Sequence, residues 1–206
     1  MMLNGQGITR KVSMKANKIK TKLIIAAVSI LVLISAFFLP TLFNASSEAK
    51  TQMLTKYGLN GLSVKEMVNK LDSVTDEKYG LNASITSTTL ILYDNEKQYD
   101  FQLPKSEFYV SFAPYLNEIH PCQTHNLVSC RGELFNKEFE ISIVKKDGTV
   151  IMNQKVKSMN SGFIGLWLPR DIEATLTINY NGTTVSKPLT TFTKSDTCIT
   201  TPLKLS

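Results

Sequence analysis

Most of the chain after residue 88 alternates apolar and polar residues with a period of two, and this alternation restricts it to β-strands. Turn signals separate the runs, and the Asn181-Gly182 pair favours the positive φ angles of a type I′ hairpin turn. Short strands at this spacing are typical of two packed sheets. We therefore predict a mainly β fold in which residues 117–206 form an immunoglobulin-like β-sandwich. The runs are 88–93, 99–103, 108–112, 139–143, 150–152, 163–168, 176–180 and 183–185.

One helix is predicted before the strands. Ser63 and Glu66 have the spacing of a capping box, in which each side chain accepts a hydrogen bond from the free backbone N–H of the other residue. Apolar residues then occur at helical spacing: Val64, Met67, Val68 and Leu71. We predict an N-terminal α+β region over residues 62–116, and we expect this helix to be structural only.

The first 43 residues have the composition of a targeting segment. Residues 1–22 contain six basic residues and no acidic residue, and an uncharged apolar stretch occupies 23–39. Its length lies between the core of a signal peptide and the roughly 20 residues that span a bilayer. Basic residues before such a stretch keep that end in the cytoplasm. We predict a basic cytoplasmic tail over 1–22 and a signal anchor, or the core of a cleaved signal peptide, over 23–43.

The same pattern predicts where the rest of the protein is located. Residues 44–61 are small and polar and are predicted to be a linker. The chain beyond the linker is expected to be extracytoplasmic, either anchored to the cytoplasmic membrane through residues 23–43 or secreted after cleavage.

Charge excludes one class of partner. The formal net charge is +6, but six of the 23 basic residues lie in the tail, and the other 17 equal the 17 acidic residues in number. A folded part with no net charge lacks the basic surface that binds a phosphate backbone. We therefore expect no nucleic-acid partner.

The scarce cysteines and histidines are concentrated in one segment. The chain has three cysteines and two histidines, and four of these five residues lie between His120 and Cys130. Two sulfurs that share a metal ion lie within about 4 Å of each other, whereas eight residues of extended chain span roughly 26 Å. Residues 122–130 must therefore fold back as a compact loop if Cys122 and Cys130 act together. Cys198 must then arrive from a neighbouring strand.

This set of residues leaves three interpretations open. Three thiolates and an imidazole suit Cu(I), which favours sulfur, and they also suit Zn(II) as a Cys₃His site. An odd number of cysteines in an exported chain is also consistent with one structural disulfide and one buried free thiol. A Cys–His nucleophile is the third interpretation, although no residue that would orient the imidazole can be identified from the sequence.

The two histidines are not equivalent as metal ligands. His125 lies between Cys122 and Cys130, so a loop that joins the two sulfurs brings its imidazole near them. His120 precedes Pro121, which biases its backbone towards extended geometry and directs its side chain elsewhere. The expected ligands are therefore Cys122, Cys130 and Cys198 with His125, and His120 is the less favoured candidate.

Four separated blocks of the sequence, in order and with all three cysteines in register, resemble the CueP family of periplasmic copper-binding proteins. The blocks are FYVSFAPYL at 108–116, HPCQTH and CRGE within 120–133, GFIGLWLPRD at 162–171 and TCITT at 197–201. The resemblance implies a copper-resistance protein that binds copper through Cys122, Cys130 and Cys198 and assembles as a homodimer. The long basic and apolar N-terminus departs from the short signal expected of a free periplasmic protein.

The expected function is that of a binding protein. It would capture copper outside the cytoplasm, preferably as Cu(I) and with Zn(II) as the other metal it could hold, and keep it or pass it to a copper-accepting protein. Two alternatives belong to other classes: a thiol redox protein that reduces Cu(II) or exchanges disulfides, and a structural module stapled by one disulfide. We identify no catalytic residue from the sequence.

Overall fold

The computed structural model describes residues 47–75 and 80–205. The predicted basic tail and the predicted membrane segment lie outside these residues. Contacts divide the chain into a unit that ends at Leu54 and a unit that starts at Thr55. The sheets and the candidate site belong to the second unit. Among the described residues, no helix is long and apolar enough to cross a bilayer.

The predicted helix is α2, Val64–Asp72, and both hydrogen bonds of its capping box are formed. Ser63 accepts a hydrogen bond from the Glu66 N–H at 3.3 Å, and the Glu66 carboxylate accepts one from the Ser63 N–H at 2.7 Å. Within the described residues, α2 is one of two short α-helices, since residues 47–56 are also helical. Its buried face consists of Met67, Val68, Leu71 and Asp72.

The first sheet lies nearest to this helix in the sequence and has the strand order β3-β2-β1-β5. It comprises β1 (Leu81–Ile85), β2 (Thr89–Asp94), β3 (Lys97–Gln102) and the short β5 (His125–Asn126). All of its pairings are antiparallel. Through β5, this sheet holds the middle of the segment that contains Cys122 and Cys130.

The second sheet has four antiparallel strands in the order β10-β9-β6-β7. Its strands are β6 (Glu138–Lys145), β7 (Val150–Lys157), β9 (Glu173–Tyr180) and β10 (Thr183–Thr190). Asn181 and Gly182 join β9 to β10 with φ angles of 51° and 84°, as the hairpin signal predicts.

The third sheet is mixed and has the order β11-β4-β8. β4 (Glu107–Phe112) pairs antiparallel with β8 (Ile164–Pro169) and parallel with β11 (Cys198–Ile199). A 3₁₀ helix, η1 (Thr201–Leu203), comes after β11. This sheet therefore joins a strand that precedes residue 117 to two strands that lie beyond it in the sequence.

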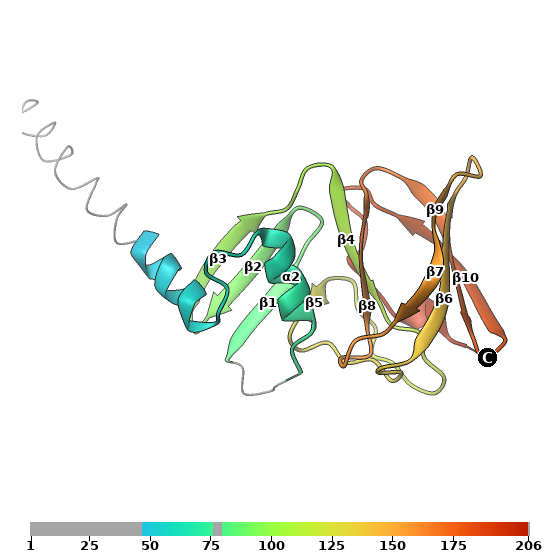
Figure 1. The fold of residues 1–206 in the computed structure, drawn as a ribbon, viewed down its shortest axis with the longest axis horizontal. Coiled ribbons are helices and arrows are strands. Elements are labelled where there is room, and N and C mark those ends of the chain that lie inside the picture. The colour runs from blue at the N-terminus through green and yellow to red at the C-terminus, as the bar shows by residue number, and fades with distance from the viewer. Residues whose placement is uncertain (1–46, 76–79, 206) are drawn as a thin grey trace, which may run out of the picture. The chain divides into compact units, whose positions relative to one another are not determined.

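The main hydrophobic core lies between the second and third sheets. Buried side chains of β4 and β8 pack against buried side chains of β6 and β9. Figure 1 shows β4 and β8 between the β1–β2–β3 sheet and the strands of the second sheet. The prediction of a mainly β protein is confirmed: three antiparallel or mixed sheets and two short helices make up the described chain.

Candidate metal centre

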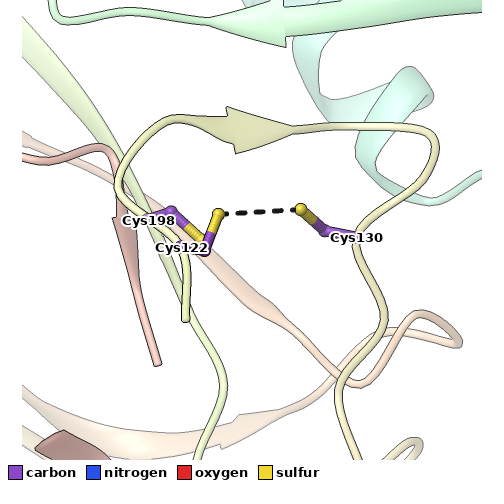
Figure 2. A group of neighbouring side chains, drawn as sticks. All are labelled: Cys122, Cys130 and Cys198. Atoms are coloured by element: carbon purple, nitrogen blue, oxygen red, sulfur yellow. Dashed lines mark hydrogen bonds between the residues drawn. The ribbon is translucent and has the colours of Figure 1, made fainter. Parts of the chain in front are cut away.

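The segment between Cys122 and Cys130 folds back as the sequence requires. Its middle pairs with β1 through β5, and Asn126 Oδ1 accepts hydrogen bonds from two backbone N–H groups just after that strand, at 3.2 and 3.0 Å. These contacts reverse the chain. As a result Cys122 Sγ lies 3.9 Å from Cys130 Sγ, the contact drawn as a dashed line in Figure 2.

Cys198 reaches this loop from the C-terminal end of the chain. It lies on β11, and the N–H groups of Thr197 and Cys198 both donate to the Gln123 carbonyl oxygen, at 3.0 and 3.1 Å. The sulfur atoms of Cys122, Cys130 and Cys198 therefore all lie within 4.8 Å of one another. Figure 2 shows the three side chains converging from the loop and from β11.

The three thiols differ in their access to solvent. Cys198 is 1% exposed, whereas Cys122 and Cys130 are half-buried. An open groove of about 450 Å³ contacts Cys122 and Cys198. The groove opens beside these two residues and is lined by Pro121, Cys122, Gln123, Asp196, Cys198, Ile199, Thr200, Thr201 and Pro202.

His125 is fully buried beside the thiols. Its ring packs on the Phe163 ring with centroids 4.8 Å apart, and its Nε2 lies 2.7 Å from Asp72 Oδ1. Within the described residues, its Nδ1 has no hydrogen-bond partner of ordinary geometry. Side-chain interactions with Cys122 and Cys130 nevertheless contribute to its pKa. The ring of His125 is therefore close enough to these two thiols to be influenced by them.

Electrostatics favour charge separation at this site. Burial lowers the pKa of His125, but the charge and hydrogen bond of Asp72, with help from the two thiols, raise it well above 6.5. The hydrogen bond from Cys198, with further contributions from His125, holds the pKa of Cys130 well below its ordinary value. The same hydrogen bond and burial raise the pKa of Cys198. Both shifts favour the charged forms of these two side chains, a thiolate at Cys130 and an imidazolium at His125.

Asp72 contacts the candidate centre through His125, and the sequence did not single it out as a candidate; the expectation that the helix is structural only stays a prediction. It ends α2 with its side chain 1% exposed, and it accepts hydrogen bonds from the Tyr109 hydroxyl and from Ser111 Oγ, the latter at 3.4 Å. One sequence signal could have found it. Asp72 lies four residues after Val68, on the apolar face of the helix, where an unpaired carboxylate would be very unfavourable.

His120 is not brought into the centre. It is exposed, and its Nδ1 lies 3.1 Å from the Pro121 carbonyl oxygen. Among the described residues, the group of potential metal-ligating atoms within 4.8 Å of one another consists of the three cysteines and contains neither His120 nor His125. Met159, by contrast, packs against the small buried cluster of Ala113, Phe163 and Cys198, as Cys122 and Cys130 also do.

Three thiols within 4.8 Å of one another, in a mainly β protein with a buried imidazole beside them, form a set of groups that suits a soft metal ion. Comparison with known proteins agrees. The family model described as "Periplasmic copper-binding protein CueP" matches residues 66–203. The chain belongs to the CueP family, as the four sequence blocks predict.

A solved structure supports the same assignment. A crystal structure of S.CueP is 40% identical in sequence to this chain and superposes with a TM-score of 0.73. The match covers 76% of this chain and 97% of the other. A search of curated proteins gave no match.

Proposed function

We propose that this chain is an extracytoplasmic copper-binding protein that captures Cu(I) through Cys122, Cys130 and Cys198 and contributes to copper resistance. The observation that carries the proposal is the convergence of three sulfur atoms within 4.8 Å of one another. Cu(I) favours thiolates and low coordination numbers, so three sulfurs can satisfy it without a further ligand. The copper-binding description of the family supports the same cargo.

His125 is proposed as the fourth ligand, through Nδ1. A buried imidazole nitrogen that lacks an ordinary hydrogen-bond partner, on a ring influenced by two thiols, is suited to accept a metal ion. Tetrahedral Zn(II) needs four ligands, so Zn(II) should depend on His125 more than Cu(I) does. His120 is exposed, with no burial beside the thiols, and we assign it no part in the site.

Location, architecture and partners are inferred from the sequence and the family. We propose that residues 1–22 are cytoplasmic, that 23–43 are a membrane anchor or a cleaved signal, and that 44–61 link this segment to the folded part. The proposed α+β region over 62–116 precedes an immunoglobulin-like sandwich over 117–206 that carries the site. A homodimer and a protein that accepts the copper are the remaining proposed partners. The family's periplasmic description supports the extracytoplasmic location.

The direct test replaces each cysteine in turn. Cys122→Ser, Cys130→Ser and Cys198→Ser should each weaken Cu(I) binding, because a hydroxyl is a hard, protonated and poor ligand for a soft ion. Affinity is measured anaerobically by competition with a coloured Cu(I) chelator. His120→Ala is the matched control and should bind as the wild type does. Unchanged affinity in Cys198→Ser would remove that residue from the site and contradict the three-thiolate proposal.

A second candidate function is thiol redox chemistry, which the 3.9 Å separation of Cys122 Sγ and Cys130 Sγ favours. Formation of one disulfide from these two thiols would release two protons and two electrons and reduce two Cu(II) ions to Cu(I). Thiol counts before and after addition of Cu(II) distinguish the alternatives. Copper-driven loss of two thiols supports the redox role, three retained thiols support simple binding, and one invariant thiol indicates a structural disulfide.

A further inference from the structure

The buried carboxylate of Asp72 is joined to the thiol cluster by one imidazole. Asp72 comes from α2, whereas His125 comes from the cysteine loop 53 residues further along the chain. Asp72 Oδ1 lies 2.7 Å from His125 Nε2, and both side chains are 1% exposed. Asp72 Oδ2 accepts from the Tyr109 hydroxyl and from Ser111 Oγ. Both carboxylate oxygens are thus engaged, and His125 is the partner able to carry a positive charge.

This arrangement determines which ring nitrogen is available to a metal ion. A carboxylate accepts but does not donate hydrogen bonds, so the contact with Asp72 requires a proton on Nε2 of His125. The lone pair of a neutral imidazole then lies on Nδ1. That atom is buried and lacks a hydrogen-bond partner of ordinary geometry among the described residues, while Cys122 and Cys130 are close enough to the ring to influence its pKa.

The surrounding chain keeps the carboxylate in place. A Cβ atom at Gly165 would lie 2.8 Å from Asp72 Oδ2 and would overlap the Tyr109 hydroxyl. Glycine at this position in β8 therefore leaves the space that the Asp72–Tyr109 pair occupies. On the other side, the Phe163 ring packs on His125 and restricts its rotation.

We propose that Asp72 is a positioning residue of the metal centre: it holds His125 through Nε2–H, so that Nδ1 is directed at an ion bound by the three thiolates. This inference rests on the proposed function. A carboxylate that accepts the second N–H of a metal-binding histidine fixes its tautomer and orientation and makes the imidazole a better ligand. The site then joins two distant parts of the chain, the end of α2 and the cysteine loop.

The test uses the full chain, with Co(II) and Zn(II) as probes and Asp72→Asn as the variant. Asparagine keeps the shape of the side chain and removes its charge. Loss of such a partner lowers metal affinity by about ten- to a hundred-fold, and we expect a loss in this range for Zn(II). The loss for Cu(I) should be smaller, because three thiolates suffice for that ion. The visible spectrum of bound Co(II) should also shift in the same direction as in His125→Ala.

Asp94→Asn is the matched control. Asp94 also accepts hydrogen bonds from a tyrosine hydroxyl and a cation, Tyr57 at 2.9 Å and Lys56 at 2.8 Å, but it lies outside the site. We expect loss of the Asp94 charge in Asp94→Asn to leave the Co(II) spectrum and the Zn(II) affinity unchanged. If Asp72→Asn fails to fold, Tyr109→Phe serves instead, since it removes one hydrogen bond from the carboxylate. It should lower Zn(II) affinity less than Asp72→Asn would, and should shift the Co(II) spectrum in the same direction.

The outcomes separate this inference from the proposed function. One outcome is that Asp72→Asn, or Tyr109→Phe in its place, keeps the wild-type Co(II) spectrum and Zn(II) affinity, whereas Cys122→Ser loses both. The metal site is then supported and the positioning role of Asp72 is refuted. If Cys122→Ser also binds as the wild type does, the proposed function itself is refuted. A fall in thermal stability alone, with unchanged spectrum and affinity, makes Asp72 a purely structural residue and overturns the inference.

Discussion

Gly165 is the position at which a single methyl group should disturb the centre most. In Gly165→Ala the new Cβ would lie 2.7 Å from Tyr109 Cζ and 2.8 Å from Asp72 Oδ2, and would overlap the Tyr109 hydroxyl. Gly165 does not have a positive φ angle, so the effect is steric. Overpacking a core costs about 1–3 kcal/mol, and loss of a hydrogen bond to a buried charged group costs about 1.5–3 kcal/mol. We expect the free energy of unfolding to fall by about 3–5 kcal/mol.

Urea unfolding of the metal-free protein measures this change, and a second background isolates its cause. Leucine at position 109 lacks both Cζ and the hydroxyl. In the Tyr109→Leu background, Gly165→Ala should therefore lower the free energy of unfolding much less than it does in the wild type. The coupling between the two substitutions should exceed about 1 kcal/mol, as for other residues in direct contact. The packing argument would be refuted if Gly165→Ala lowered the free energy of unfolding by less than about 1 kcal/mol in the wild-type background, or by the same amount in both backgrounds.

Three further predictions concern the thiolate, the helix and the groove. In metal-free Cys122→Ser, the alkylation rate of Cys130 should change little between about pH 6 and 8, because its pKa is lowered and the reactive thiolate persists as pH falls; a tenfold rise per pH unit would contradict this. Ser63→Ala removes the acceptor for the Glu66 N–H and should lower the free energy of unfolding by about 1 kcal/mol. An unchanged urea midpoint would show that the Ser63 N-cap does not stabilise the fold. Thr201→Trp should narrow the groove and slow the transfer of Cu(I) from the protein to a chelator, while the affinity for Cu(I) stays unchanged. An unchanged transfer rate would exclude the groove as the route by which Cu(I) leaves the site.

The sequence predicted the elements whose signals are local. The capping box marks the start of α2, and the Asn181-Gly182 hairpin lies where its φ preferences require. Three strands were missed: β1, Leu81–Ile85, which precedes the first predicted run, and two that depend on partners elsewhere in the chain. β5 and β11 have two residues each, too few for any periodicity, and they exist because β1 and β4 supply hydrogen bonds to them.

The candidate centre was only partly predictable for the same reason. Cys122 and Cys130 are close in sequence, so chain geometry alone required a compact loop between them. The Asp72 contact with His125 joins residues 53 positions apart, and no spacing rule relates them. Only the placement of a carboxylate on the apolar face of a helix hinted that it had a buried partner.

The central claim is that three free thiols form one copper site. Native mass spectrometry of anaerobically purified protein loaded with Cu(I) tests it most directly, because it reports metal content and thiol oxidation in the same ion. We predict one copper per chain with all three cysteines reduced, and no bound copper in Cys198→Ser at the same chelator concentration. A copper-free chain lighter by two hydrogens would reveal a disulfide in place of a metal site and would contradict the account.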